Sequence, residues 1–181
     1  MSEHIRQPAL ESYLWGAATN LRGLVDAGDY KQFVFPLLFY KRLSDVWDED
    51  YVQALEDTGD ATYALETAND RFIIPDSAHW KDVRTTPKNV GRALQKAMRA
   101  LEAANPGHLA GIFGDAPWTN KERLPDVTLK NLLEHLSSVV LSLENVPEDE
   151  LGNGYEYLIK KFADDSGHTA RSFTLIVPWF I

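Results

Sequence analysis

Apolar residues recur every three or four positions over long stretches of this chain, and this spacing constrains the fold more than any other feature. Over residues 10–25 they form one stripe along an expected helix, which Gly28 then ends. A second, longer helix is expected from Tyr30 to about Leu55. Pro36 lies near its start, where proline either kinks a helix or delays its beginning. The first third of the chain is therefore predicted to be helical.

The same period continues through the rest of the chain, with one interruption. Residues 72–84 begin with the β-prone sequence Phe72-Ile73-Ile74, and Pro75 disfavours helical backbone in the residue before it. The predicted fold class is mainly α, a single helical-bundle domain with at most a small β element near residues 72–84. The other expected helices cover residues 62–68, residues 86–105 with Thr86 as cap and Pro87 in first position, residues 129–143, and about 148–164.

Composition and charge exclude several functional classes. Hydrophobic residues make up 44% and charged residues 25% of the 181 positions, as in an ordinary globular protein. Cysteine is absent, which excludes disulfides, thiolate metal sites and cysteine nucleophiles. The net charge of −9 disfavours binding to nucleic acid through the chain as a whole. Residues 71–99 are the exception, because this stretch contains seven Lys or Arg and only two Asp.

The motifs of common enzymes and metal sites do not occur. The five histidines are widely separated, and no glycine loop for phosphates or dinucleotides and no nucleophile elbow is present. We therefore predict no catalytic, cofactor-binding or metal-binding residue in this chain. The acidic run Asp48-Glu49-Asp50 is interpreted as a solvated helix end, because consecutive side chains fan out around a helix and cannot converge on a cation.

One group of residues indicates a binding surface. Lys88, Arg92, Lys96 and Arg99 recur at intervals of four, four and three residues, which places all four cations on one helix face. A stripe of cations without an interleaved acid suits the backbone of a polyanion such as duplex DNA. An ordinary solvated face, or a face that binds a protein partner, explains the pattern equally well. The four residues are thus candidate DNA contacts.

Several segments resemble a known protein family. The first is LESYLWGAATNLRGLVDAGDYKQFVFPLLFYKRLSDVWDED, with its LW, LRG, YK and PLLF-x-KRLSD elements. RFIIPDSAHW, GRALQKAMRALEAANPGHLAGIF and ELGNGYEYLIKKFADDSG follow in the same order. Together they resemble the N-terminal helical domain of the modification (methyltransferase) subunit of type I restriction–modification systems, over about residues 10–170.

The resemblance implies a function for the complete subunit. In that family the helical domain precedes a domain that binds S-adenosylmethionine and methylates adenine at N6. It works with a DNA-specificity subunit and a second modification subunit, and it helps to close the complex around duplex DNA. Neither the family's Pro-Ala-Cys-Gly-type cofactor loop nor its Asn-Pro-Pro-aromatic motif occurs here. We therefore expect a DNA-clamping and assembly domain, residues 1–170, that is inactive as a methyltransferase on its own.

The last residues, 171–181, depart from the family pattern. They read RSFTLIVPWFI, whereas one back-translation of this stretch, shifted in frame, encodes the family-like EFYTNRTVVH. This suggests the hypothesis of a one-base frameshift that shortens a longer subunit. Large apolar residues dominate the tail, so self-association through residues 171–181 is also expected.

A different class of function stays open on the sequence alone, namely a stand-alone helical protein-interaction or regulatory module with no role in methylation. Both alternatives predict a cytoplasmic protein without a membrane anchor. The N-terminus has charges and a proline where a signal peptide needs an apolar run, and no apolar stretch approaches the ~20 residues of a membrane-spanning helix.

Overall fold

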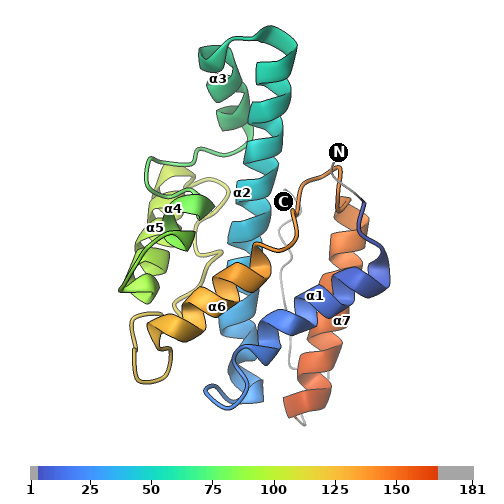
Figure 1. Ribbon diagram of the computed structural model, residues 1–181, viewed down its shortest axis with the longest axis vertical. Helices are drawn as coiled ribbons and strands as arrows, with labels where there is room; N and C mark the ends of the chain where they lie inside the picture. The colour runs from blue at the N-terminus through green and yellow to red at the C-terminus, as the bar shows by residue number, and fades with distance from the viewer. Residues whose placement is uncertain (1–3, 167–181) are drawn as a thin grey trace.

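The computed structural model describes residues 4–166, and its central element is α2 (Tyr30–Thr58), a helix of 29 residues (Figure 1). Twelve consecutive residues of this helix, from Phe33 to Ser44, are buried. A helix that is buried on all sides must be covered by other elements all round. Pro36 lies inside this stretch and neither delays nor ends the helix, because α2 begins at Tyr30.

The remaining helices surround α2. On one side, α1 (Gln7–Thr19) packs against α7 (Glu148–Ser166), and on the other side lie α4 (Trp80–Arg84) and α5 (Val90–Ala104) (Figure 1). The short 3-10 helix η1 (Ala27–Asp29) leads into α2, and α6 (Asp126–Leu136) contacts both α1 and α5. The described chain is therefore a helical bundle, as the apolar spacing predicts.

The far end of α2 forms a hairpin with α3 (Ala61–Arg71) that extends beyond the rest of the bundle (Figure 1). Gly59 ends α2 with a left-handed backbone, φ 68°, which glycine adopts without steric cost. The next residue, Asp60, caps α3 by accepting the backbone N–H groups of Thr62 and Tyr63 at 2.9 and 3.2 Å. Local sequence thus determines this turn.

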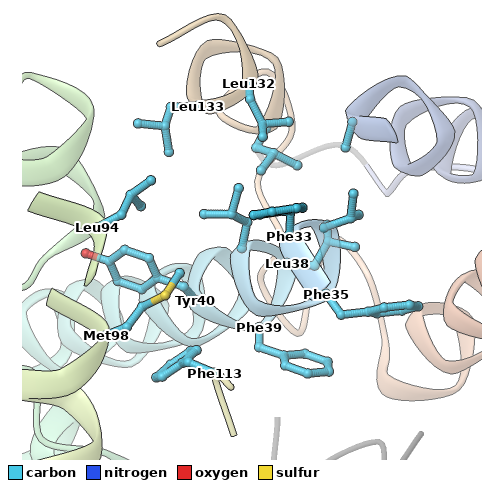
Figure 2. Close-up of a cluster of buried hydrophobic side chains, with 14 of the residues drawn as sticks. Phe33, Phe35, Leu38, Phe39, Tyr40, Leu94, Met98, Phe113, Leu132 and Leu133 are labelled. Atoms are coloured by element: carbon cyan, nitrogen blue, oxygen red, sulfur yellow. The ribbon is translucent and has the colours of Figure 1, made fainter. Parts of the chain in front are cut away.

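Aromatic and aliphatic side chains from several helices fill the core. Phe33, Phe35 and Phe39 of α2 point into it, with Tyr40 beside Leu94 and Met98 of α5 (Figure 2). The Tyr40 hydroxyl, which has no exposed surface to bond with water, donates to the carbonyl of Ala78 at 2.6 Å. Burial on this scale supplies most of the driving force for folding.

No strand forms within residues 4–166, so the small β element allowed near residues 72–84 is absent. Phe72 does have extended backbone, but no neighbouring strand pairs with the segment. Instead the carboxamide of Asn105 accepts the Ile73 N–H and donates to the Ile73 carbonyl, both at 2.8 Å. One side chain thus satisfies the backbone groups that a second strand would have bound. Trp80–Arg84 then forms the short helix α4, which the sequence pattern did not indicate.

Three expected helix boundaries are also wrong. α1 ends at Thr19 and does not continue to residue 25, since residues 20–24 form turns. α5 begins at Val90, because the Thr86 hydroxyl donates to the carbonyl of Asp82 at 3.0 Å and completes the turn after α4. α6 ends at Leu136, and residues 137–147 are not helical although their apolar spacing continues. Side chains of α2 bind the backbone of this segment, as described below. The expected domain boundary at residue 170 and the tail 171–181 lie outside the described residues.

Candidate nucleic-acid interface

The predicted cation stripe lies on the exposed side of α5. Arg92, Lys96 and Arg99 are exposed, whereas Leu94 and Met98 of the same helix are buried in the core. Lys88 is exposed too, but it lies in the turn that precedes the helix. Within residues 4–166 none of the four cations forms an ion pair or hydrogen bond with another side chain. Three members therefore share one helix face, and the fourth extends it at the N-terminal end.

The N-terminus of α5 is held by a residue that the sequence pattern did not single out. The carboxylate of Asp126, the first residue of α6, accepts the backbone N–H groups of Asn89 and Val90 at 2.8 and 3.0 Å. These bonds hold the pKa of Asp126 below its usual range. Asn89 itself has a left-handed backbone, φ 57°, and makes no capping bond with its side chain. The cap is thus supplied from a distant part of the chain.

Gly91 lets a loop approach α5 closely. A Cβ atom at this position would lie 1.8 Å from the carbonyl oxygen of Trp118, which no larger residue permits. The loop that precedes α6 therefore packs directly on the first turn of α5. Two lysines from this part of the chain, Lys121 and Lys130, reach the turn around Lys88. Neither belongs to a periodic pattern with the stripe, so the sequence contained no signal for them.

The KRLSD motif of α2 has a structural role. The Nη1 atom of Arg42 donates to three carbonyl oxygens, those of Leu141 at 2.9 Å, Ser142 at 2.9 Å and Val146 at 2.6 Å. Lys41 donates to the carbonyl of Val139 at 2.8 Å. These bonds fix the irregular segment between α6 and α7.

Two carboxylates of α2 complete this arrangement, which we call the α2 clamp (Lys41, Arg42, Asp45 and Glu49). Asp45 pairs with Lys41 and accepts the Leu141 N–H at 2.6 Å. Glu49 accepts the N–H groups of residues 143 and 144 at 2.9 and 3.0 Å, so it is not part of a solvated helix end. Burial raises the pKa of Asp45 and lowers that of Lys41, and each group's charge opposes the shift in the other.

The described residues contain no other converging set of chemical groups. No three His, Asp or Glu side chains within residues 4–166 lie close enough together to hold a metal ion. His135 illustrates a structural role, since its Nε2 lies 2.7 Å from the Tyr13 carbonyl and its ring stacks on the Tyr13 ring. None of the helices in this part of the chain has the length and apolar character needed to span a bilayer.

Comparison with known proteins finds similarity to subunits of restriction enzymes. It is similar to the methylase subunit of the type I restriction enzyme MpnII from Mycoplasma pneumoniae, with 21% identity over 91% of this chain and 36% of that protein. The methylase subunit of the type I enzyme MjaIX from Methanocaldococcus jannaschii shows 24% identity over 94% of this chain and 35% of that protein. The chain thus spans about a third of the length of these relatives.

A solved structure has the same fold. The crystal structure of a type I restriction–modification methyltransferase subunit from Streptococcus thermophilus superposes with a TM-score of 0.69, at 24% identity, over 90% of this chain and 40% of that one. Residues 10–136 match the family model described as the HsdM N-terminal domain. The match includes α1 to α6 and contains both the KRLSD motif and the cation stripe. This chain therefore belongs to the HsdM N-terminal domain family.

Proposed function

We propose that this chain acts as the N-terminal DNA-clamping and assembly domain of a type I adenine-N6 methyltransferase subunit. Membership of the family supports this role, and both relatives described above are methylase subunits of type I restriction enzymes. The comparisons offer no support for the alternative of a stand-alone interaction module. The partners of the proposed clamping domain would be a DNA-specificity subunit, a second modification subunit and duplex DNA. S-adenosylmethionine would bind outside this chain.

The observation that carries the DNA contact is the unpaired state of the stripe. Single exposed cations without an acidic partner occur elsewhere in the described chain, but here four lie together along α5 and the turn before it. Other exposed cations do have an acidic partner. Arg84 pairs with Glu134, and Arg71 with Asp50, in this way. The cations of α5 have no such partner among the described residues, so their charge is available to a phosphate backbone.

The distribution of charge favours one orientation on DNA. Eight carboxylates and one cation lie between residues 48 and 71, on the far half of α2 and on α3. This hairpin extends away from the rest of the bundle, whereas α5 lies on one side of the bundle itself (Figure 1). A duplex is therefore repelled by the hairpin and attracted to α5, which reduces the number of ways in which the domain docks.

The test is binding of a fluorescent duplex followed by anisotropy over a range of salt concentrations. Four phosphate contacts predict a slope of about −3 to −4 in a plot of log K against log salt. Replacing Lys88, Arg92, Lys96 and Arg99 by Glu should abolish the binding while the helical circular dichroism stays unchanged. The matched control makes the same change at four exposed cations elsewhere, Arg6, Arg22, Lys160 and Lys161. Equal affinity of the stripe variant and the wild type would refute the DNA contact.

A further inference from the structure

Three lysine side chains from separate parts of the chain converge on the turn before α5. Lys88 belongs to the turn itself. Lys121, from the loop before α6, donates to the side-chain oxygen of Asn89. Lys130, from α6, donates to the carbonyl oxygen of Pro87 at 2.5 Å. Each bond uses one of three ammonium donors, so both lysines keep their full charge and two free N–H groups.

These cations outnumber the acids beside them. Asp126 is the one carboxylate among the residues that line the adjacent hollow, and its two oxygens already accept the N–H groups of Asn89 and Val90. Lys121 and Lys130 both act on it, since their charges help to keep the pKa of Asp126 low, after the backbone hydrogen bonds. Gathering like charges costs folding free energy. The excess positive charge therefore indicates an anion as its missing partner.

The hollow at this place has room for a small anion. It encloses about 230 Å³ and is lined by polar and apolar groups from α5 and the loop before α6: Asn89, Gly91, Arg92, Trp118, Thr119, Lys121, Leu124 and Asp126. Sites for small organic ligands are larger, roughly 300–1,000 Å³. The absence of a side chain at Gly91 keeps the Trp118 loop close to α5, so the two sides of the hollow are held at a fixed distance.

We propose that this hollow, the α5 corner (Arg92, Thr119 and Lys121, with Lys88 and Lys130 at the turn), is a binding site for one phosphate group. Asp126 already accepts the N–H groups of Asn89 and Val90 at this helix terminus, so the proposed site does not depend on them. The ligand contacts are side chains, with the Arg92 guanidinium able to bind two oxygens at once. The identification of the phosphate as part of a DNA backbone rests on the function proposed above. Such a site fixes the point at which a strand crosses α5.

The first experiment changes the two lysines that the stripe does not contain. K121Q/K130Q is compared with K160Q/K161Q, which removes two exposed lysines of α7, on the opposite side of α2 (Figure 1). K121Q/K130Q removes two cations that bind phosphate, so the slope of log K against log salt should become shallower by about 1–2. The affinity for the duplex at about 0.1 M salt should fall at least about tenfold. The charge-retaining variant K121R/K130R should restore both values, which a purely structural role of the lysines would not require.

A second variant separates failure of the α5 corner from failure of the proposed function. K96Q/R99Q changes only the helix face and leaves the corner intact. If K96Q/R99Q weakens DNA binding and K121Q/K130Q does not, the corner is refuted as a DNA contact, the stripe is retained, and the phosphate titration described below decides whether the corner binds an anion at all. If neither variant weakens binding, the proposed DNA contact is refuted, and a titration with inorganic phosphate alone decides about the corner.

The phosphate titration is followed by amide chemical shifts in the wild type. A saturable shift of residues 88–92 and 118–121 that disappears in K121Q/K130Q establishes an anion site that does not depend on DNA. A loss of duplex affinity without such a shift also supports the corner and assigns it to the phosphodiester of a polymer. Unchanged duplex affinity together with no saturable shift overturns the inference.

Discussion

Replacing Arg42 by Met tests whether the α2 clamp stabilises the fold. The Arg42 side chain has no exposed surface, and its Nη1 atom donates to the carbonyl oxygens of Leu141, Ser142 and Val146. Met has a similar length but donates no hydrogen bond. The three carbonyl oxygens would lose this donor, and the segment before α7 would lose its anchor on α2.

The magnitude follows from a balance of buried polar groups. A buried polar atom left without a partner costs about 1–3 kcal/mol. The variant leaves the carbonyl oxygens of Leu141 and Val146 without their donor, whereas that of Ser142 still accepts the Val146 N–H at 2.9 Å. It also removes two guanidinium nitrogens of Arg42, Nε and Nη2, that have no partner among the described residues. It further relieves the burial of a charge, which is the main reason that the pKa of Arg42 is lowered. Two lost hydrogen bonds to a charged donor, at about 1.5–3 kcal/mol each, exceed the relief at the two nitrogens, at about 1 kcal/mol each, so the net loss is about 1–4 kcal/mol.

The assay is urea unfolding followed by far-ultraviolet circular dichroism, at equal protein concentrations. R42M should unfold at lower urea, whereas the control R22M, at an exposed position, should stay within about 0.5 kcal/mol of the wild type. Hydrogen exchange of the amides of residues 141–146 should become faster in R42M. A variant as stable as the wild type, or more stable, would show that the cost of burying the charge exceeds the value of its hydrogen bonds, and the reasoning would be refuted.

Three further predictions concern other parts of the chain. The free energy of unfolding of G91A should fall by about 1–3 kcal/mol, because its Cβ atom would collide with the Trp118 carbonyl. That of G152A, whose Cβ would have no atom within 4 Å, should rise by about 0.5–1 kcal/mol. Urea unfolding compares the two variants, and equal effects would contradict the close approach at Gly91. Because the pKa of Asp126 is lowered, its carboxylate stabilises the fold above the ordinary pKa of about 3.9 and this contribution fades as the pH falls through the lowered value. Melting temperatures of the wild type and D126N should therefore differ at about pH 6 and converge as the pH falls below the ordinary pKa of an Asp, and E122Q serves as the control for removing an exposed carboxylate at about pH 6. Calorimetry should detect no stoichiometric binding of S-adenosylmethionine to this chain, and a micromolar affinity would overturn the assignment of the cofactor to another domain.

The helical class and the core could be predicted from the sequence because they depend on local spacing. The aromatic residues at helical intervals, such as Phe33, Phe39 and Tyr40, are buried as expected. Of the two glycines of α7, Gly154 permits close packing of two helices, since a Cβ atom there would lie 2.6 Å from Leu14. Gly152 has no such neighbour, since a sequence pattern cannot say which side of a helix meets another helix.

Helix ends and polar contacts could not be predicted in this way, because they depend on residues distant in the sequence. The apolar spacing after Leu136 continues, yet the helix ends, because the α2 clamp binds the backbone of the following residues. The extended segment at Ile73 pairs with the side chain of Asn105 and not with a strand. In both cases a group more than thirty positions away decides the local backbone, and no window of sequence contains both partners.

Local sequence patterns were enough to predict a helical bundle and a row of four cations along one segment. Apolar periodicity and the KRLSD motif are properties of neighbouring residues, so they can be read without the fold. The folded arrangement was needed to show that Lys121 and Lys130 join Lys88 at the start of α5, and that Asp126 caps this helix. These groups meet because α5 and α6 pack on each other, and charges act through space and not along the chain.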